Sequence, residues 1–284
     1  MTQVAILGPG LLGGSIALAA QRAGGFRVSA WARRAEAVAE IETRGLADLA
    51  STDLATVVQG ANLVILCVPV GAMGAIARQI APLLSTDAIV TDVGSVKAPV
   101  VAELSPIFAG HAQFIGSHPM AGSEQTGLDA ARANLFDDAA CIVTPEESTS
   151  PTTVSTIHTF WQTLGCRVLE TSPTEHDRMV AWISHFPHLL AATLVNVVAE
   201  QDAPAFDFAG PGFRDTTRVA AGAPGMWTEI LCSNRAAVRQ SVEAMIEKLR
   251  EITTLLDHDA SMTEFLTLAK TQRDRLRLPK PSHV

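Results

Sequence analysis

Short apolar runs alternate with helical patterns in the first part of the chain. Residues 4–7 and 63–68 are unbroken apolar runs, the pattern of a strand covered on both faces. Further strands are predicted at residues 26–32, 88–93, 114–115, 140–143 and 167–169, and helices at 15–23, 35–49, 71–84, 151–164 and from residue 95 through Glu103. Strands that alternate with helices predict an α/β fold, with a mostly parallel, doubly wound sheet and helices on both faces.

From residue 173 onward the pattern changes to helices only. Residues 174–200 are largely helical with a kink expected at Pro187, and the Gly/Pro-rich residues 208–224 predict a structured loop or short turns. Residues 234–256 form an amphipathic helix with heptad-spaced apolar positions: Val238, Val242, Met245, Leu249, Ile252 and Leu256. Such a seam needs a partner helix, from the same chain or from a second subunit. We therefore predict two domains, at residues 1–172 and 173–284.

A glycine-rich turn joins the first strand to the first helix. Residues 8–13 read Gly-x-Gly-x-x-Gly, in the order strand, turn, helix that a dinucleotide-binding fingerprint requires. Gly8 permits the tight turn, Gly10 lets the backbone approach a pyrophosphate, and Gly13 lets the helix pack against the strand. The alternative is a purely structural turn. We predict a Rossmann-type domain whose cofactor contacts include Gly8, Gly10, Leu11, Leu12 and Gly13.

The end of the second strand bears on the choice of cofactor. An NAD enzyme carries an acidic residue there for the ribose 2′-hydroxyl, whereas this chain reads Ala32-Arg33-Arg34 with no acid before Glu36. Two cations without a carboxylate suit a 2′-phosphate, so Arg33 and Arg34 predict NADP, with NAD as the alternative. The two arginines could instead cap a surface turn.

Composition excludes several classes of protein. The 284 residues are 48% hydrophobic and 18% charged, as in a globular enzyme, and a net charge of −8 without a dense basic cluster argues against a nucleic-acid partner. Residues 179–199 approach a membrane span but contain His185, Pro187 and His188, so we expect a buried helical segment and no membrane partner. The absence of tyrosine excludes the short-chain dehydrogenases, which need a catalytic one.

The cysteines and the N-terminus indicate a cellular location. Four cysteines lie far apart in apolar surroundings without a Cys-x-x-Cys pair: Cys67, Cys141, Cys166 and Cys232. They predict reduced core residues in a cytoplasmic protein. The first strand starts directly after residues 1–3, which leaves no room for a signal peptide.

Chemistry is expected beyond the carboxyl ends of the parallel strands, where open α/β sheets bind ligands. Three stretches fall at such ends: Cys67-Val68-Pro69, residues 92–97 and residues 116–122. His118 lies among them and suits a proton acceptor near neutral pH, although a lone strand-end histidine is more often structural. Ser95 could bind a substrate hydroxyl or form the N-cap of the following helix.

The helical region offers further polar candidates. His185 and His188 stand three residues apart in an apolar helix without a third ligand beside them, so we predict no metal site and favour a buried polar substrate. Arg214 and Arg218 lie in one turn, and arginine suits a carboxylate. A local ion pair of Arg214 with Asp215 is the alternative.

These motifs together resemble the prephenate/arogenate dehydrogenase family of tyrosine biosynthesis. The resemblance spans almost the whole chain, through the motifs at residues 8–15, 92–97, 116–122, 184–188 and 212–218. It implies an N-terminal Rossmann domain and a helical domain that dimerises. It also places the catalytic histidine at His118, the hydroxyl-binding serine at Ser95, and substrate contacts at His188 and Arg218, with a gating acid at Glu124. Many members carry an acid where this chain has Ala32, and these use NAD.

The resemblance implies oxidative decarboxylation of prephenate or arogenate, with hydride transfer to NADP or NAD. The expected product is 4-hydroxyphenylpyruvate or tyrosine. The resemblance also implies a homodimer joined through the C-terminal helices, which we expect to be cytoplasmic from the cysteines above. The residues do not choose between the two substrates. Two alternatives are a β-hydroxyacid-type dehydrogenase of similar two-domain fold, whose catalytic lysine and asparagine pattern is missing here, and a nucleotide-sensing protein without turnover.

Overall fold

The N-terminal domain is built on a single mixed sheet. The computed structural model describes residues 1–122 and 125–276. Within these residues, one eight-stranded sheet has the order β3-β2-β1-β4-β5-β6-β7-β8. Its strands are β1 (Thr2–Leu7), β2 (Phe26–Trp31), β3 (Leu49–Ser51), β4 (Leu63–Leu66), β5 (Ile89–Asp92), β6 (Gln113–Pro119), β7 (Ala140–Thr144) and β8 (Arg167–Glu170). The central strands are apolar and fully buried, as a sheet covered on both faces requires.

All strand pairs are parallel except β6 with β7. β6 pairs with β5 over residues 113–115 and with antiparallel β7 over residues 116–119. The second half of β6 therefore extends beyond the carboxyl end of β5. The predicted α/β fold with a mostly parallel, doubly wound sheet is confirmed.

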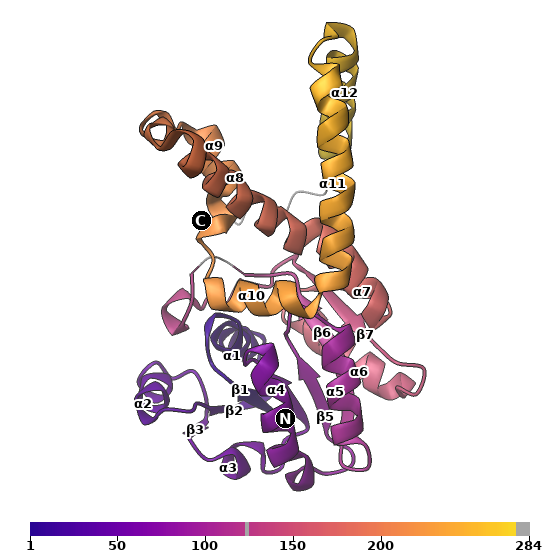
Figure 1. The fold of residues 1–284 in the computed structure, drawn as a ribbon. Coiled ribbons are helices and arrows are strands. Elements are labelled where there is room, and N and C mark those ends of the chain that lie inside the picture. The colour runs from indigo at the N-terminus through magenta and orange to yellow at the C-terminus, as the bar shows by residue number, and fades with distance from the viewer. Residues whose placement is uncertain (123–124, 277–284) are drawn as a thin grey trace.

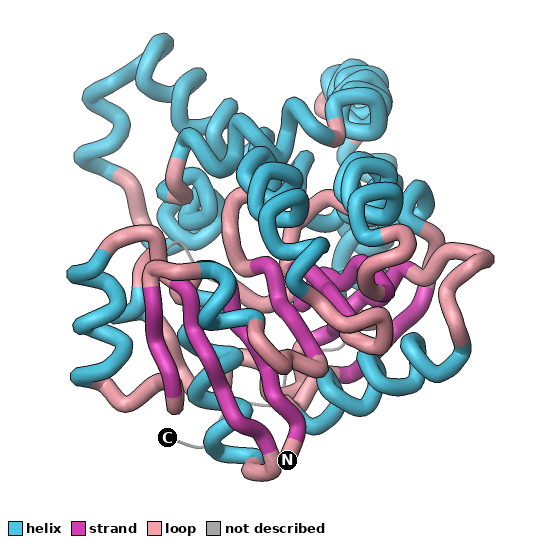
Figure 2. Tube along the Cα trace, turned by 90° about the horizontal axis from the view of Figure 1, so that it is seen from below, coloured by secondary structure: helices cyan, strands magenta, loops and turns pink. Residues whose placement is uncertain are grey.

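Helices cover both faces of the sheet (Figure 2). Side chains of α1 (Leu11–Ala23), α2 (Ala35–Thr43) and α6 (Pro151–Thr163) pack into one apolar core, together with Val4 and Ile6 of β1. Those of α3 (Leu54–Val58), α4 (Val70–Ile80) and α5 (Ala98–Phe108) pack into a second core, with Ala5 and Leu7. Alternate residues of one strand thus enter opposite cores, which is the period-two geometry of a strand.

The glycine turn allows α1 to start immediately above β1. Gly8 has φ +100°, and a Cβ there would lie 2.7 Å from the Cys67 carbonyl oxygen. At Gly13 a Cβ would lie 2.5 Å from the Gly8 carbonyl oxygen, so only glycine lets α1 pack this closely on the turn. The backbone geometry is therefore that of a dinucleotide-binding turn.

One predicted helix in this domain is shorter than expected. The helix expected over residues 35–49 ends at Thr43, because Gly45 takes φ +61° and its N–H bonds back to the Glu42 carbonyl. The chain then forms β3 and α3, which the sequence did not predict. Leu46, which follows the turn at Gly45, is buried.

The C-terminal domain is helical and lies beyond the carboxyl edge of the sheet (Figure 1). Its helices are α7 (Pro173–Val180), α8 (Phe186–Asp202), α9 (Pro211–Thr217), α10 (Pro224–Ser233), α11 (Arg235–Leu255) and α12 (Asp259–Asp274), with short turns η4 (Ala203–Phe208) and η5 (Arg218–Ala221). In Figure 1, α10 is the helix of this domain that lies next to α4, while α8 and α11 project away from the sheet. The arrangement brings α7 and α10 against the sheet domain.

Two local predictions for the helical domain need correction. The irregularity expected at Pro187 lies just before it, in the π-helical turn η3 (Ala181–His185), because a proline in the first turn of α8 has no N–H for the preceding turn. Within residues 208–224, expected to be loop or turns, Pro211 starts α9.

Burial of the apolar helices is lower than the sequence predicted. Residues Pro173–Phe208 are long and apolar enough to cross a membrane by length and composition, and 33% of the most apolar window is buried in the single chain. Along the heptad seam, Val238 is buried, but Leu249 is 50% and Leu256 is 69% exposed. Cys232 is also exposed, so the prediction of four core cysteines was wrong for it, whereas Cys141 and Cys166 are buried and all four are free thiols.

Candidate functional site

The candidate site lies where the carboxyl edge of the sheet meets the helical domain. His118 is in the second half of β6, which runs to Pro119 and is therefore longer than the strand predicted at residues 114–115. Ser95 lies between β5 and α5, and Val68 and Pro69 follow β4. The structure therefore brings these predicted residues to one edge, as the parallel topology requires.

His118 is 6% exposed and bonded to a residue of the helical domain. Its Nδ1 lies 2.8 Å from Nε2 of His176 on α7, and the Nδ1 of His176 lies 2.8 Å from Oδ1 of Asp177. Burial lowers the pKa of His118 well below its ordinary value, and the neighbouring His176, Lys97 and His185 lower it further. His118 is thus kept neutral, the form that accepts a proton.

Asp177 holds the start of α5 from the opposite domain. Its Oδ1 accepts from the Lys97 backbone N–H at 2.7 Å, and its Oδ2 accepts from the Ala98 N–H at 2.9 Å. The N-terminus of a helix favours a carboxylate, so this contact caps α5. The alternative reading of Ser95 as that cap is wrong, because the N-cap residue is Lys97.

Ser95 is positioned through its backbone. Its carbonyl oxygen accepts from Nε2 of His185 at 3.2 Å. The Nδ2 of Asn234 donates both to Nδ1 of His185, at 3.1 Å, and to the Asp177 carbonyl, at 2.7 Å. In the part of the chain that the structure describes, the Ser95 hydroxyl makes no hydrogen bond, which leaves it for a ligand.

A buried ion pair lies behind His118. The side chains of Lys97 and Asp92 are fully buried and paired, and the Lys97 Nζ also donates to the Ser117 carbonyl oxygen at 2.9 Å. Burial lowers the pKa of Lys97, although the charge of Asp92 opposes the shift. Asp92 also accepts from the backbone N–H of Gly94 and of Ser117, so the pair fixes the backbone on both sides of the site.

His188 lies in a different polar environment from His185. Its ring stacks on Trp227 with 3.6 Å between centroids and a 9° tilt, and its Nδ1 is buried without a hydrogen-bond partner among the described residues. Burial lowers its pKa, opposed by a hydrogen bond to the Val219 backbone. The exposed Arg218 begins η5, which packs against α8. The buried, unpartnered Nδ1 of His188 suits a polar ligand.

The residues around the glycine turn fit a dinucleotide. A Cβ at Gly10 would meet no atom within 4 Å, so the backbone is open to a ligand there. Leu11, Leu12 and Gly13 form the first turn of α1, and no side chain caps that turn. Its N–H groups and the helix dipole suit a pyrophosphate. A Cβ on Gly8 would lie 2.8 Å from Val68, which places Val68 against the same turn.

The two predicted arginines lie at the end of β2. Arg33 and Arg34 are both exposed, and Arg34 is the N-cap residue of α2 but makes no side-chain cap. Neither side chain forms an ion pair within the described residues. The cap alternative is therefore unsupported for Arg34. Glu124, the predicted gating acid, lies outside the described residues.

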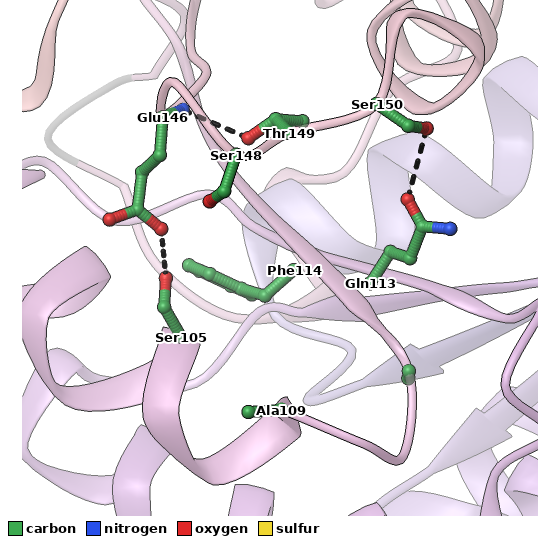
Figure 3. Close-up of a pocket in the computed structure, with 9 residues that line it drawn as sticks. Ser105, Ala109, Gln113, Phe114, Glu146, Ser148, Thr149 and Ser150 are labelled. Carbon is green, nitrogen blue, oxygen red and sulfur yellow. Dashed lines mark hydrogen bonds between the residues drawn. The ribbon is translucent and has the colours of Figure 1, made fainter.

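A surface pocket at the opposite edge of the sheet is separate from this site (Figure 3). It is bounded by Gln113 and Phe114, at the amino end of β6. Figure 3 shows Glu146 accepting from Ser105, and Ser150 donating to Gln113 at 3.1 Å. These polar side chains are already paired with one another, so the pocket adds no group to the chemistry.

Sequence reasoning missed the residues that connect the site. His176 and Asp177 were not singled out, although two adjacent titratable residues at the start of an apolar helix are a usable signal. Lys97 belongs to a quoted motif, but no role followed from it. Asn234 and Trp227 come from the junction of α10 and α11 and from α10, and only the folded chain brings them here.

The comparisons with known proteins match both domains. The family described as "Prephenate dehydrogenase, nucleotide-binding domain" matches residues 16–170, and "Prephenate dehydrogenase, dimerization domain" matches residues 172–271. The chain belongs to the prephenate dehydrogenase family. It is accordingly an NAD(P)-dependent dehydrogenase of tyrosine biosynthesis, and the predicted family and enzyme class are confirmed.

Members of this family resemble the chain over nearly its whole length. A cyclohexadienyl dehydrogenase from Zymomonas mobilis is 34% identical, covering 97% of this chain and 95% of that protein. The crystal structure of an Aquifex aeolicus prephenate dehydrogenase, in complex with hydroxyphenyl propionate and NAD+, has a TM-score of 0.90 at 30% identity and covers 98% and 99% of the two chains. A Synechocystis arogenate dehydrogenase has a TM-score of 0.84 at 32% identity, covering 96% and 99%.

The buried histidines predict a loss of stability in acid. Burial lowers the pKa of His185 to about 4, from 6.5. As the pH falls below 6.5, the unfolded chain therefore takes up a proton that the folded chain refuses, and the free energy of unfolding decreases. Burial lowers the pKa of His118 and His176 as well, which adds in the same direction.

We expect His185→Gln to reduce this acid sensitivity, since glutamine can still donate to the Ser95 carbonyl but does not titrate. Between pH 6 and 4.5, the variant's free energy of unfolding should fall less steeply than that of the wild type, by up to about 1.4 kcal/mol per pH unit. Denaturant unfolding at several pH values measures the slope. Equal slopes for both proteins would contradict the argument.

Proposed function

We propose that this dehydrogenase oxidatively decarboxylates prephenate or arogenate with NADP as hydride acceptor, giving 4-hydroxyphenylpyruvate or tyrosine. One observation carries the proposal: His118, neutral and buried, belongs to the same hydrogen-bond network that positions Ser95. A base and a hydroxyl at the carboxyl edge of a nucleotide-binding sheet are what oxidation of an alcohol needs.

His118 is the proposed general base. It takes the proton of the ring hydroxyl as the hydrogen on the same carbon leaves with its electron pair, while Ser95 hydrogen-bonds the hydroxyl oxygen. Bound NADP supplies the hydride acceptor. The bond to the ring carboxylate then breaks, its electrons enter the ring, and carbon dioxide leaves. Because the ring becomes aromatic, the step is effectively irreversible and the protein needs to supply little beyond position and one base.

Two residues of the helical domain are proposed to hold the substrate. Arg218 suits a carboxylate, because guanidinium binds it with two parallel hydrogen bonds. The buried, unpartnered Nδ1 of His188 supplies a second polar contact. We also retain Glu124 as a substrate contact, on the resemblance of its motif alone.

His118→Asn tests the assignment of the base. The substitution removes the proton acceptor, so kcat should fall by about 10³-fold or more while the Kd for NADP stays within about twofold. Steady-state rates and isothermal titration calorimetry with NADP measure the two quantities, with Tm as a check on folding. Near-normal turnover by the folded variant would refute the role of His118.

The proposed preference for NADP rests on Arg33 and Arg34. Both are exposed at the end of β2, the sequence carries no acidic residue there before Glu36, and both are unpaired among the described residues. Guanidinium groups bind phosphate through charge-assisted hydrogen bonds. Gly8, Gly10, Leu11, Leu12, Gly13, Val68 and Pro69 are proposed to hold the rest of the cofactor.

Replacing both arginines by alanine should weaken NADP binding selectively. Loss of two charge-assisted contacts predicts a Kd for NADP that rises by about 10-fold to 100-fold, with the Kd for NAD nearly unchanged. Isothermal titration with both cofactors measures this ratio, and NAD serves as the internal control. Parallel changes in both constants would favour the alternative, NAD.

The proposed assembly is a cytoplasmic homodimer with domains at residues 1–172 and 173–284. The helical domain matches a dimerization domain, and the family ranges meet at residues 170–172. Apolar side chains of three helices are exposed in the single chain, on α8 (Leu190, Leu194, Val197), α11 (Ile246, Leu249) and α12 (Leu266, Leu268). A second copy would cover them and supply the partner helix for the heptad seam.

Leu249→Glu tests the proposed dimer. In a two-fold interface each substitution enters twice, so two buried charges would have to be desolvated. Sedimentation velocity should show a dimer for the wild type and a larger monomer fraction for the variant. A wild-type chain that stays monomeric at micromolar concentration would overturn the proposal.

A further inference from the structure

A line of hydrogen bonds runs from the helical domain to His118. It starts at the Asp177 carboxylate, passes through His176, and ends at Nδ1 of His118. All three side chains are buried, with exposures of 5%, 0% and 6%. The two links are both 2.8 Å long, so each is a full hydrogen bond with one donor and one acceptor.

The Asp177 carboxylate determines which atom donates and which accepts in each of these hydrogen bonds. Both oxygens of Asp177 already accept backbone N–H groups, those of Lys97 and Ala98 at the start of α5. A carboxylate in this position acts as an acceptor, so the Nδ1 of His176 must carry the proton between them. A neutral imidazole has one N–H, and the Nε2 of His176 is therefore an acceptor.

The same reasoning then fixes His118. Its Nδ1 faces an acceptor and must donate, which leaves the lone pair on Nε2. Both rings are neutral at rest, because burial lowers the pKa of each. In the described part of the chain, the Nε2 of His118 has no hydrogen-bond partner, so the lone pair is available to a substrate.

We propose that His176 and Asp177 are positioning residues that hold His118 in the tautomer with its proton on Nδ1 and its lone pair on Nε2. The inference deepens the proposed function and rests on it for the use of that lone pair. When His118 takes a proton, its Nδ1–H stays bonded to His176, and the Asp177 carboxylate lies at the end of the same line. The arrangement therefore stabilises the imidazolium as it forms.

The line also crosses the domain boundary. His118 is on β6, whereas His176 and Asp177 are on α7, and Asn234 fixes the Asp177 backbone from the start of α11. The N-terminal domain alone cannot set the tautomer of its own base. Correct packing of α7 on the sheet is thus a condition for activity and not only for stability.

Four variants distinguish an effect on the hydrogen bonding of His118 from a general loss of protein stability. His176→Leu removes both ring nitrogens, whereas His176→Gln keeps an acceptor near the position of Nε2. Asp177→Asn keeps the shape but can present an N–H to His176, which favours the other tautomer. His158→Leu is the matched control, because His158 of α6 is a partly buried histidine that pairs with Glu170 of β8 and takes no part in this line of hydrogen bonds.

For the full-length enzyme with saturating NADP, kcat should fall about 10²-fold to 10⁴-fold in His176→Leu and Asp177→Asn, with KM changed little. His176→Gln should recover at least tenfold of that loss. His158→Leu should keep the wild-type kcat, whatever its effect on Tm. A kcat within threefold of wild type in His176→Leu overturns the proposal.

The tautomer itself is measured without turnover. Nitrogen NMR of enzyme labelled at histidine, with the His118 signals assigned by their loss in His118→Asn, should show a protonated Nδ1 and an unprotonated Nε2. Asp177→Asn should reverse or mix these signals. A protonated Nε2 in the wild type overturns the proposal, whereas turnover by His118→Asn would overturn the proposed base and leave the tautomer result standing.

Discussion

The structure depends on one carboxylate that serves both domains. Asp177 of α7 accepts the first free N–H groups of α5, a helix of the sheet domain, and so stabilises a helix end that its own domain leaves uncapped. Its Oδ1 also accepts a hydrogen bond from Nδ1 of His176, and its backbone carbonyl oxygen accepts one from Nδ2 of Asn234. One residue thereby fixes the domain contact, the position of Ser95 two residues before Lys97, and the hydrogen-bonding of the proposed base.

The parts of the fold and site that the sequence predicts are those encoded locally. The apolar runs of β1 and β4 are buried on both faces, so their pattern is unbroken. The glycine turn can likewise be predicted from the sequence, because a φ of +100° at Gly8 and the close packing at Gly13 restrict both positions to glycine. His118 and Ser95 could be placed at the same edge because parallel strands bring their carboxyl ends together.

The rest depends on contacts between distant residues. β6 continues to Pro119 because β7 offers it a partner, and the residues 116–119 have no strand pattern of their own. The partners of His118 and Ser95 lie 58 and 90 residues away in the sequence. A hydrogen bond across such a separation leaves no periodic trace, so His176, Asp177 and Asn234 could not be recognised from spacing alone. The helix predicted through residue 49 ends early for a local reason, because Gly45 adopts a positive φ that stops the helix. A glycine in a helical pattern permits this conformation but does not require it, so the sequence alone did not show the break.

The site also departs from the usual rule that titratable side chains are exposed to solvent. Lys97, Asp92, His118, His176 and His185 are all buried, and burying groups that could be charged costs stability unless each finds a partner. Here the partners are mostly one another, so the residues are stable only as a set, and removing one leaves another unsatisfied. A chain selected for stability alone would replace the set with apolar residues. That this chain retains it, at the junction of two domains, follows if the junction must hold one imidazole neutral and in a single orientation while the substrate and cofactor come and go.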